Sequence, residues 1–128
     1  MPHFIYEFSP NIEQGLKLPE LFEKMHEVAI DTGVFPLGGI RSRAYKADYY
    51  RISDGDPTLG FIHLCIKVGA GRTEETLKAA ADRLFDCLTE HLQELFDSQY
   101  LGISMEMMEI HPTITYKKNN IHQKFKKD

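Results

Sequence analysis

Hydrophobic residues in the first part of the chain follow a period of two and then a helical period. Aromatic residues occupy alternate positions in residues 2–8, which predicts a strand. Apolar residues then recur at helical spacing over residues 18–32, where Pro19 suits a first helical turn and Gly33 suits the position after the last turn. Residues 40–52 carry few helix signals and several tyrosines, so we predict a long second strand there.

The second part of the chain repeats this order of elements. Residues 61–68 place aliphatic side chains at alternate positions, so one face of the predicted strand is apolar. Thr73 is a suitable N-cap, and a stripe of apolar residues continues from Leu77 to Phe96, which predicts one long helix. Residues 101–110 alternate imperfectly, and we interpret them as a strand because of their position after this helix.

A strand–helix–strand order that occurs twice predicts a duplicated βαβ architecture. The chain of 128 residues fits a single domain over residues 1–128, with one unit over residues 2–52, a second over 60–110 and a tail over 111–128. The two strands of each unit should be parallel and joined by a right-handed crossover, because a helix connects them. We expect an α+β fold, a two-layer sandwich in which two helices cover one face of a mixed four-stranded sheet.

Three tyrosines and a basic tail bear on possible partners. Tyr45, Tyr49 and Tyr50 would leave the helix-free face of the sheet too apolar for full exposure, and we expect oligomerisation to cover it. The tail is rich in lysine. We interpret it as a short solvated segment, or as one whose Ile121 and Phe125 dock on a neighbouring subunit.

Composition and charge argue against several classes of protein. A formal charge of -4 and a pI near 5.8 disfavour binding to nucleic acid. No apolar run approaches the roughly 20 residues of a membrane span, and a secretory signal pattern is absent, so we expect no membrane partner and a cytoplasmic location. The six histidines show no metal-binding spacing, and the chain lacks a Walker lysine and a serine-hydrolase elbow. We therefore assign no metal.

Pro2 is the residue for which the sequence most directly suggests chemistry. A small side chain in position two permits removal of Met1, which would expose a secondary amine at the start of a strand. An α-amino group has an unperturbed pKa of about 7.7–8.0, and both burial and nearby cations lower that pKa. A proline amine that is largely neutral near pH 7 could serve as a general base.

Three arginines could bind an anion beside such a base. Arg41 and Arg43 lie two residues apart in a predicted strand, so they share a face and could hold two carboxylates. A solvated pair on an edge strand is the alternative reading of these two residues. Arg72 ends a glycine-containing turn before the second helix, where free backbone N–H groups and the helix dipole favour an anion. The residues thus point to a dianionic substrate.

Short motifs spread over the chain carry a resemblance to a known family. They are Met-Pro-His-Phe (residues 1–4), Phe-Pro-Leu-Gly-Gly-Ile-Arg-Ser-Arg (35–43), Val-Gly-Ala-Gly-Arg (68–72), His-Pro-Thr (111–113) and Asn-Asn-Ile-His (119–122). In these motifs the chain resembles the 5-carboxymethyl-2-hydroxymuconate Δ-isomerase family of the tautomerase superfamily. Members of that superfamily use an amino-terminal proline and commonly assemble as trimers of duplicated βαβ units.

The resemblance implies an isomerase that transposes a C=C bond. The reaction would be the allylic keto–enol proton shift of 5-carboxymethyl-2-hydroxymuconate in bacterial breakdown of homoprotocatechuate (4-hydroxyphenylacetate). By the same resemblance, Pro2 would be the general base, Arg41 and Arg72 would bind carboxylate and carbonyl oxygens, and Arg43 would be a further substrate-binding candidate. The resemblance also implies a homotrimer, a di- or tricarboxylate substrate and no cofactor.

The chain departs from the superfamily pattern at one place. Shorter members carry an arginine just after the first strand, whereas residues 9–14 contain none. Only Arg72 in the second half remains, which implies one active site per chain. Two alternatives stay open: another proline-based activity, such as a hydratase or dehalogenase acting on an unsaturated acid, and a non-catalytic trimeric protein that binds an anion.

Overall fold

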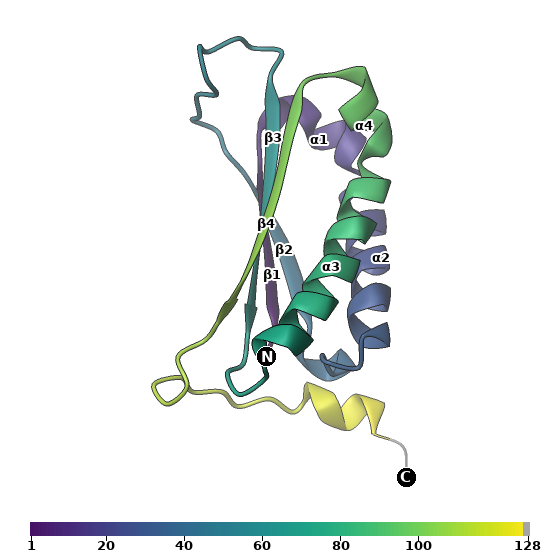
Figure 1. The fold of residues 1–128 in the computed structure, drawn as a ribbon, viewed down its shortest axis with the longest axis vertical. Helices are drawn as coiled ribbons and strands as arrows, with labels where there is room; N and C mark the ends of the chain where they lie inside the picture. Colours follow the sequence, from purple (N-terminus) through teal and green to yellow (C-terminus); the bar gives the residue numbers. More distant parts are fainter. Residues whose placement is uncertain (127–128) are drawn as a thin grey trace.

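The computed structural model describes residues 1–126 and shows a sheet with helices on one face (Figure 1). The strands are β1 (His3–Phe8), β2 (Arg41–Lys46), β3 (Gly60–Val68) and β4 (Leu101–Glu109). The α-helices are α1 (Glu13–Leu16), α2 (Leu18–Asp31), α3 (Glu74–His91) and α4 (Gln93–Ser98). Three 3-10 turns are η1 (Pro10–Ile12), η2 (Leu37–Gly39) and η3 (Ile121–Phe125).

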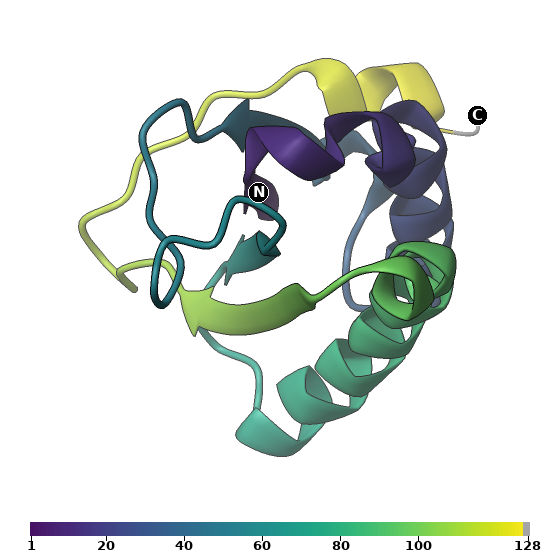
Figure 2. The same cartoon turned by 90° about the horizontal axis from the view of Figure 1, so that it is seen from above.

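The four strands lie in the order β2-β1-β3-β4. β1 and β2 are parallel, β3 and β4 are parallel, and the two inner strands β1 and β3 are antiparallel. The long helices α2 and α3 connect the parallel pairs and lie on the same side of the sheet (Figure 2). The expected α+β sandwich of two βαβ units with a mixed sheet is therefore confirmed. The single domain over residues 1–128 stays a prediction.

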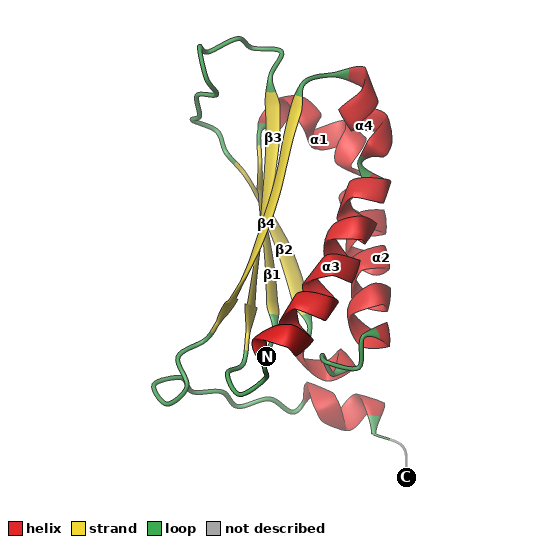
Figure 3. Cartoon of the chain, viewed as in Figure 1, coloured by secondary structure: helices red, strands yellow, loops and turns green. Residues whose placement is uncertain are grey.

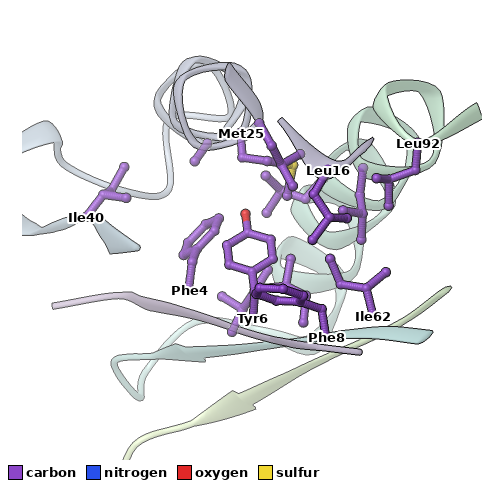
Figure 4. Packing of buried hydrophobic residues seen from close by; sticks show 14 of the residues in the cluster. Phe4, Tyr6, Phe8, Leu16, Met25, Ile40, Ile62 and Leu92 are labelled. Atoms are coloured by element: carbon purple, nitrogen blue, oxygen red, sulfur yellow. The ribbon is translucent and has the colours of Figure 1, made fainter. Parts of the chain in front are cut away.

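The alternating pattern of β1 and β3 builds the core. Side chains at every second position of these strands point towards the helices, where Phe4, Tyr6 and the aliphatic residues of β3 are fully buried (Figure 4). The Tyr6 ring packs against Phe22 of α2, with ring centroids 5.3 Å apart. Its hydroxyl oxygen is buried without a hydrogen-bond partner among the described residues, and burial raises the pKa of Tyr6. Tyr6 thus places an unpaired hydroxyl among apolar side chains.

The second strand is shorter than the predicted residues 40–52. β2 ends at Lys46, and residues 47–59 form a long loop (Figure 3). The reason is the length of its partner. β1 ends at Phe8, whose carbonyl accepts the last ladder bond from the Ala47 N–H, and within residues 1–126 β2 has no neighbour on its other edge. The loop is instead held by Asn11, whose side-chain amide donates to the carbonyls of Pro57 and Leu59.

The predicted long helix over residues 73–96 is divided at Leu92. This residue leaves helical geometry, with φ -94° and ψ 5°, and α4 begins after it. Leu92 is fully buried, and Leu95 of α4 packs so closely on Gly15 that a Cβ there would lie 2.6 Å from its Cδ2. The bend thus directs Leu92 and Leu95 onto the core. The spacing of apolar residues in the sequence did not predict this bend.

The helix-free face of the sheet is more polar than the tyrosines suggested. The register places three rows on this face, in which most side chains are charged or polar: Arg41, His3, Lys67 and Met108, then Arg43, Ile5, Cys65 and Glu106, then Tyr45, Glu7, His63 and Ser104. Tyr49 and Tyr50 belong to the loop after β2, where Tyr49 is almost fully exposed. The expected oligomer that would cover this face stays a prediction.

The tail folds back onto its own chain, so the interpretation of a merely solvated tail is wrong for residues 119–122. After β4 it passes beneath the amino-terminal end of the sheet (Figure 1) and η3 packs on η2. The Asn119 side-chain amide donates to the Gly38 carbonyl over 3.2 Å. Ile121 and Phe125 keep 47% and 44% of their surface exposed, and their docking on a neighbouring subunit stays a prediction. Residues 127 and 128 of the predicted tail lie outside the described range.

Within residues 1–126, no helix is both long enough and apolar enough to cross a membrane.

We expect Tyr6→Phe to leave the free energy of unfolding unchanged or to raise it by about 1 kcal/mol. The substitution keeps the packed ring and removes a buried hydroxyl that has no partner within residues 1–126. Tyr6→Ala is the control, and its cavity should cost about 3–5 kcal/mol. Chemical denaturation measures both values. A loss of more than about 1 kcal/mol in Tyr6→Phe would show that the hydroxyl has a partner in solution.

Candidate active site

The sheet topology brings four chain segments to one end of the molecule. β1 and β2 begin at this end, because they are parallel, and β3 ends there, because it is antiparallel to β1. β4 ends there as well and leads into the tail. Four segments therefore meet at one end of the sheet: the amino terminus, the turn before β2, the turn after β3 and the tail.

Pro2 is buried at this end of the sheet and is held there by backbone pairing. Its carbonyl accepts a hydrogen bond from the Arg41 N–H over 3.2 Å, which continues the β1–β2 ladder by one step. The Pro2 ring lies next to Gly39, where a Cβ would be 3.4 Å from the Pro2 Cδ. The predicted position of Pro2 at the start of a strand, held within the sheet, agrees with this geometry.

A cavity of about 270 Å³ opens beside Pro2. All four segments contribute to its wall, namely Met1 and Pro2, then Phe35, Pro36 and Gly39, then Gly69, Ala70 and Arg72, and finally Lys117 and His122. Larger hollows lie elsewhere, such as one of about 500 Å³ between α3 and β4, but they contain neither Pro2 nor a candidate arginine. The cavity at Pro2 is therefore the candidate site.

Arg72 reaches the cavity wall from the turn after β3. Its Nη2 donates to the Val34 carbonyl over 2.8 Å, and its Nη1 lies 3.4 Å from the Gly69 carbonyl, to which it also donates. A guanidinium carries five N–H groups, so donors remain for an anion. Because both protein partners are neutral carbonyls, the positive charge of Arg72 is not cancelled by them.

The start of α3 offers fewer free N–H groups than expected. The Thr76 N–H is capped by the Thr73 hydroxyl over 3.1 Å, and the Gly71 N–H donates to the Glu109 carboxylate over 3.2 Å. A carboxylate of the chain already lies at this helix start, so it is the Arg72 guanidinium that remains available to a ligand.

The other two arginines lie differently from Arg72. Arg41 contacts Pro2 through its backbone, and its buried Nε has no hydrogen-bond partner among the described residues. Arg43 donates from Nη1 to Nδ1 of His3 over 3.1 Å on the helix-free face. Burial, and then the charges of Arg43 and Arg41, lower the pKa of His3, which suits a neutral ring that accepts this bond. Of the three, only Arg72 lines the cavity.

The surroundings of the amino terminus disfavour a positive charge. Burial lowers the pKa of the Met1 amine, and the charges of Lys117, Arg41 and Arg72 lower it further, in that order. Arg41 therefore acts on the site through its charge although it does not line the cavity. Within residues 1–126, no cluster of histidine, cysteine and acidic side chains is placed to hold a metal ion.

Sequence reasoning missed Lys117 and His122 as cavity residues. Lys117 belongs to a run of basic residues in which nothing distinguishes it from Lys118. The one sequence feature that could have indicated their position is the Asn-Asn-Ile-His motif, because it forms the turn that docks on Gly38. Only the folded tail shows that this turn places Lys117 beside the amino terminus.

Comparison with known proteins identifies the family. Residues 2–125 match the family described as 5-carboxymethyl-2-hydroxymuconate isomerase. The 5-carboxymethyl-2-hydroxymuconate Delta-isomerase of Escherichia coli is 42% identical over 126 residues, which are 98% of this chain and 100% of that protein. These matches confirm the predicted class of enzyme, an isomerase that shifts a carbon–carbon double bond.

Solved structures give the same result for the fold. A 5-carboxymethyl-2-hydroxymuconate isomerase from Deinococcus radiodurans R1 is 39% identical, has a TM-score of 0.91, and covers 98% of this chain and 95% of its own. A fused 4-OT symmetric trimer is 16% identical, with a TM-score of 0.63 and coverage of 91% and 93%, and shows the fold alone. The chain belongs to the 5-carboxymethyl-2-hydroxymuconate isomerase family.

Proposed function

We propose that this chain catalyses the allylic keto–enol proton shift of 5-carboxymethyl-2-hydroxymuconate, with Pro2 as the general base once Met1 is removed. The reaction belongs to the breakdown of homoprotocatechuate. The observation that carries the proposal is the cavity in which Pro2 and Arg72 share one wall. The 42% identity to the Escherichia coli isomerase supports the choice of substrate.

The proposed chemistry moves one proton and needs no oxidant or reductant. The free Pro2 nitrogen takes the proton of the 2-hydroxyl group, and the double bonds shift as the 2-oxo group forms. The protonated amine then returns the proton to a carbon of the conjugated chain and becomes neutral again. An amine with a lowered pKa is suited to both steps, because it is neutral before the reaction and acidic enough to release the proton.

The arginines have different parts in this proposal. Arg72 binds a carboxylate or the developing 2-oxo oxygen, because its guanidinium lines the cavity and is held by neutral carbonyls. The charge of Arg41 lowers the pKa of the Met1 amine, and we expect the same direction for the Pro2 amine. Its buried Nε, which has no partner among the described residues, makes Arg41 a second ligand for the substrate in this proposal. The contact of Arg43 with His3 favours a structural role, so we place it outside the direct contacts.

We also propose that the chain forms a homotrimer in which the helix-free face of the sheet is covered. The exposed Tyr45 near the end of β2 and the symmetric trimer formed by the fused 4-OT protein, which has the same fold, support this assembly. The cytoplasmic location inferred from the sequence stays a prediction.

We expect activity to depend on loss of Met1. When Met1 remains, the Pro2 nitrogen is an amide without a basic lone pair, so kcat/KM should fall by about 10²–10⁴-fold, the usual contribution of a general base. Intact mass would identify the processed and unprocessed forms, and circular dichroism would check that both fold alike. Equal turnover by the two forms would refute Pro2 as the base, and a processed form that binds but never isomerises the substrate would favour a non-catalytic anion-binding protein.

We expect the acid limb of the pH profile of kcat/KM to lie below the usual α-amino pKa of about 8. Burial and three cations lower the pKa of the Met1 amine, and we expect them to act in the same direction on the Pro2 amine that replaces it, so the base should stay neutral to lower pH. Arg41→Gln removes one cation, raises the pKa of the amine and should move the limb to higher pH. Lys118→Gln, which removes an exposed charge not among the cavity residues, is the control. An unchanged limb in Arg41→Gln would contradict this electrostatic role.

A further inference from the structure

The tail is held at the candidate site by specific contacts. The Asn119 side chain donates to the Gly38 carbonyl over 3.2 Å, and its Oδ1 accepts the Ile121 N–H over 2.8 Å. His122 packs on η2, where a Cβ on Gly38 would lie 2.7 Å from the His122 Nδ1. Since Gly39, the residue after Gly38, lies next to Pro2, this docking fixes the segment from Lys117 to His122 against the site.

The docked tail adds a positive charge to the cavity. Lys117 lines the wall together with Arg72, and the wall contains no aspartate or glutamate from the described residues. Of the ion pairs formed within residues 1–126, none includes Lys117 or Arg72. Among charged groups, Lys117 has the largest effect in lowering the pKa of the amino terminus, which agrees with an ammonium close to it. Lys117 and Arg72 thus line the cavity without an ion-pair partner among the described residues.

The number of cations matches the charge of the proposed substrate. The muconate skeleton carries two carboxylates, and the 5-carboxymethyl group adds a third. Arg72 and Lys117 supply two cations in the cavity wall, and Arg41, which lies outside the wall, supplies a third whose charge reaches the amino terminus. A lysine ammonium binds as a compact point charge on a flexible stem, which suits a carboxylate on a rotatable methylene arm.

We infer that Lys117 is a substrate-binding residue that recognises the carboxymethyl carboxylate, and that the docked segment from Lys117 to His122 selects tricarboxylate over dicarboxylate muconates. This inference rests on the proposed function for the identity of the substrate. It assigns to the tail a role in specificity in addition to its packing.

Steady-state kinetics with two substrates tests the inference. Lys117→Met should lower kcat/KM for 5-carboxymethyl-2-hydroxymuconate about tenfold to a hundredfold, mostly through KM, which is the size expected for one charge-assisted hydrogen bond. For 2-hydroxymuconate, which lacks the carboxymethyl group, the change should be less than about threefold. Lys118→Met should affect neither substrate, and Lys117→Arg should restore the preference for the tricarboxylate.

An equal loss for both substrates, or no loss for either, would overturn the inference. Asn119→Ala tests whether the docking of the tail matters in addition to the positive charge of Lys117. The variant keeps Lys117 but loses both tail hydrogen bonds, so it should reduce the preference for the tricarboxylate in the same direction. If the preference is untouched in Asn119→Ala, the docked segment does not set it.

A binding measurement distinguishes failure of this inference from failure of the proposed function. Calorimetry on the processed protein compares the unreactive propane-1,2,3-tricarboxylate with glutarate. If the protein does not isomerise the muconate but loses its preference for the tricarboxylate in Lys117→Met, the proposed reaction fails and the role of Lys117 stands. If it isomerises the muconate and Lys117→Met binds both acids as the parent protein does, the role of Lys117 fails alone.

Discussion

The antiparallel pairing of β1 with β3 is the constraint on which the candidate site depends. Ladder bonds join His3 to Lys67 in this register, so the start of the first βαβ unit lies beside the end of the second. The turn after β3 therefore presents Arg72 to the amino terminus of its own chain. Were the two inner strands parallel, Arg72 would lie at the far end of the sheet from Pro2. β1 is also an inner strand, paired on both edges, which gives the terminus a rigid support.

The concentration of positive charge at this end has a physical cost that an anion can relieve. Lys117, Arg41 and Arg72 lie close enough to act on one amine, and like charges in a partly buried site repel one another. The same repulsion lowers the pKa of the amine at the terminus. A polyanionic substrate would reduce the repulsion among the cations and would supply the group from which the amine removes a proton. Basicity of the amine and affinity for the substrate thus come from the same side chains.

The sequence predicted the parts of the fold that local pattern determines. Alternation in residues 2–8 and 61–68 and helical spacing in residues 18–32 correspond to β1, β3 and α2, which form most of the core. The end of β2 was missed because it depends on where β1 ends, and the bend at Leu92 was missed because it depends on packing against Gly15. Pro2 and Arg72 could be selected from the sequence by their chemistry and motifs. The position of Lys117 in the cavity could not, because it depends on a turn that docks on Gly38, a residue distant in the sequence.

The opposite end of the sheet lacks the features found at Pro2, which supports the prediction of one site of this kind per chain. There β3 begins at Gly60, an internal residue whose N–H donates to the Tyr100 carbonyl, so no free amine is present. Ser9 is fully buried, accepts the Phe61 N–H and donates to Asn11, which closes this end with hydrogen bonds. Residues 9–14 also contain no arginine. The two units thus share a framework, but within residues 1–126 it is the end with Pro2, Arg72 and the docked tail that combines a terminal amine with several nearby cations.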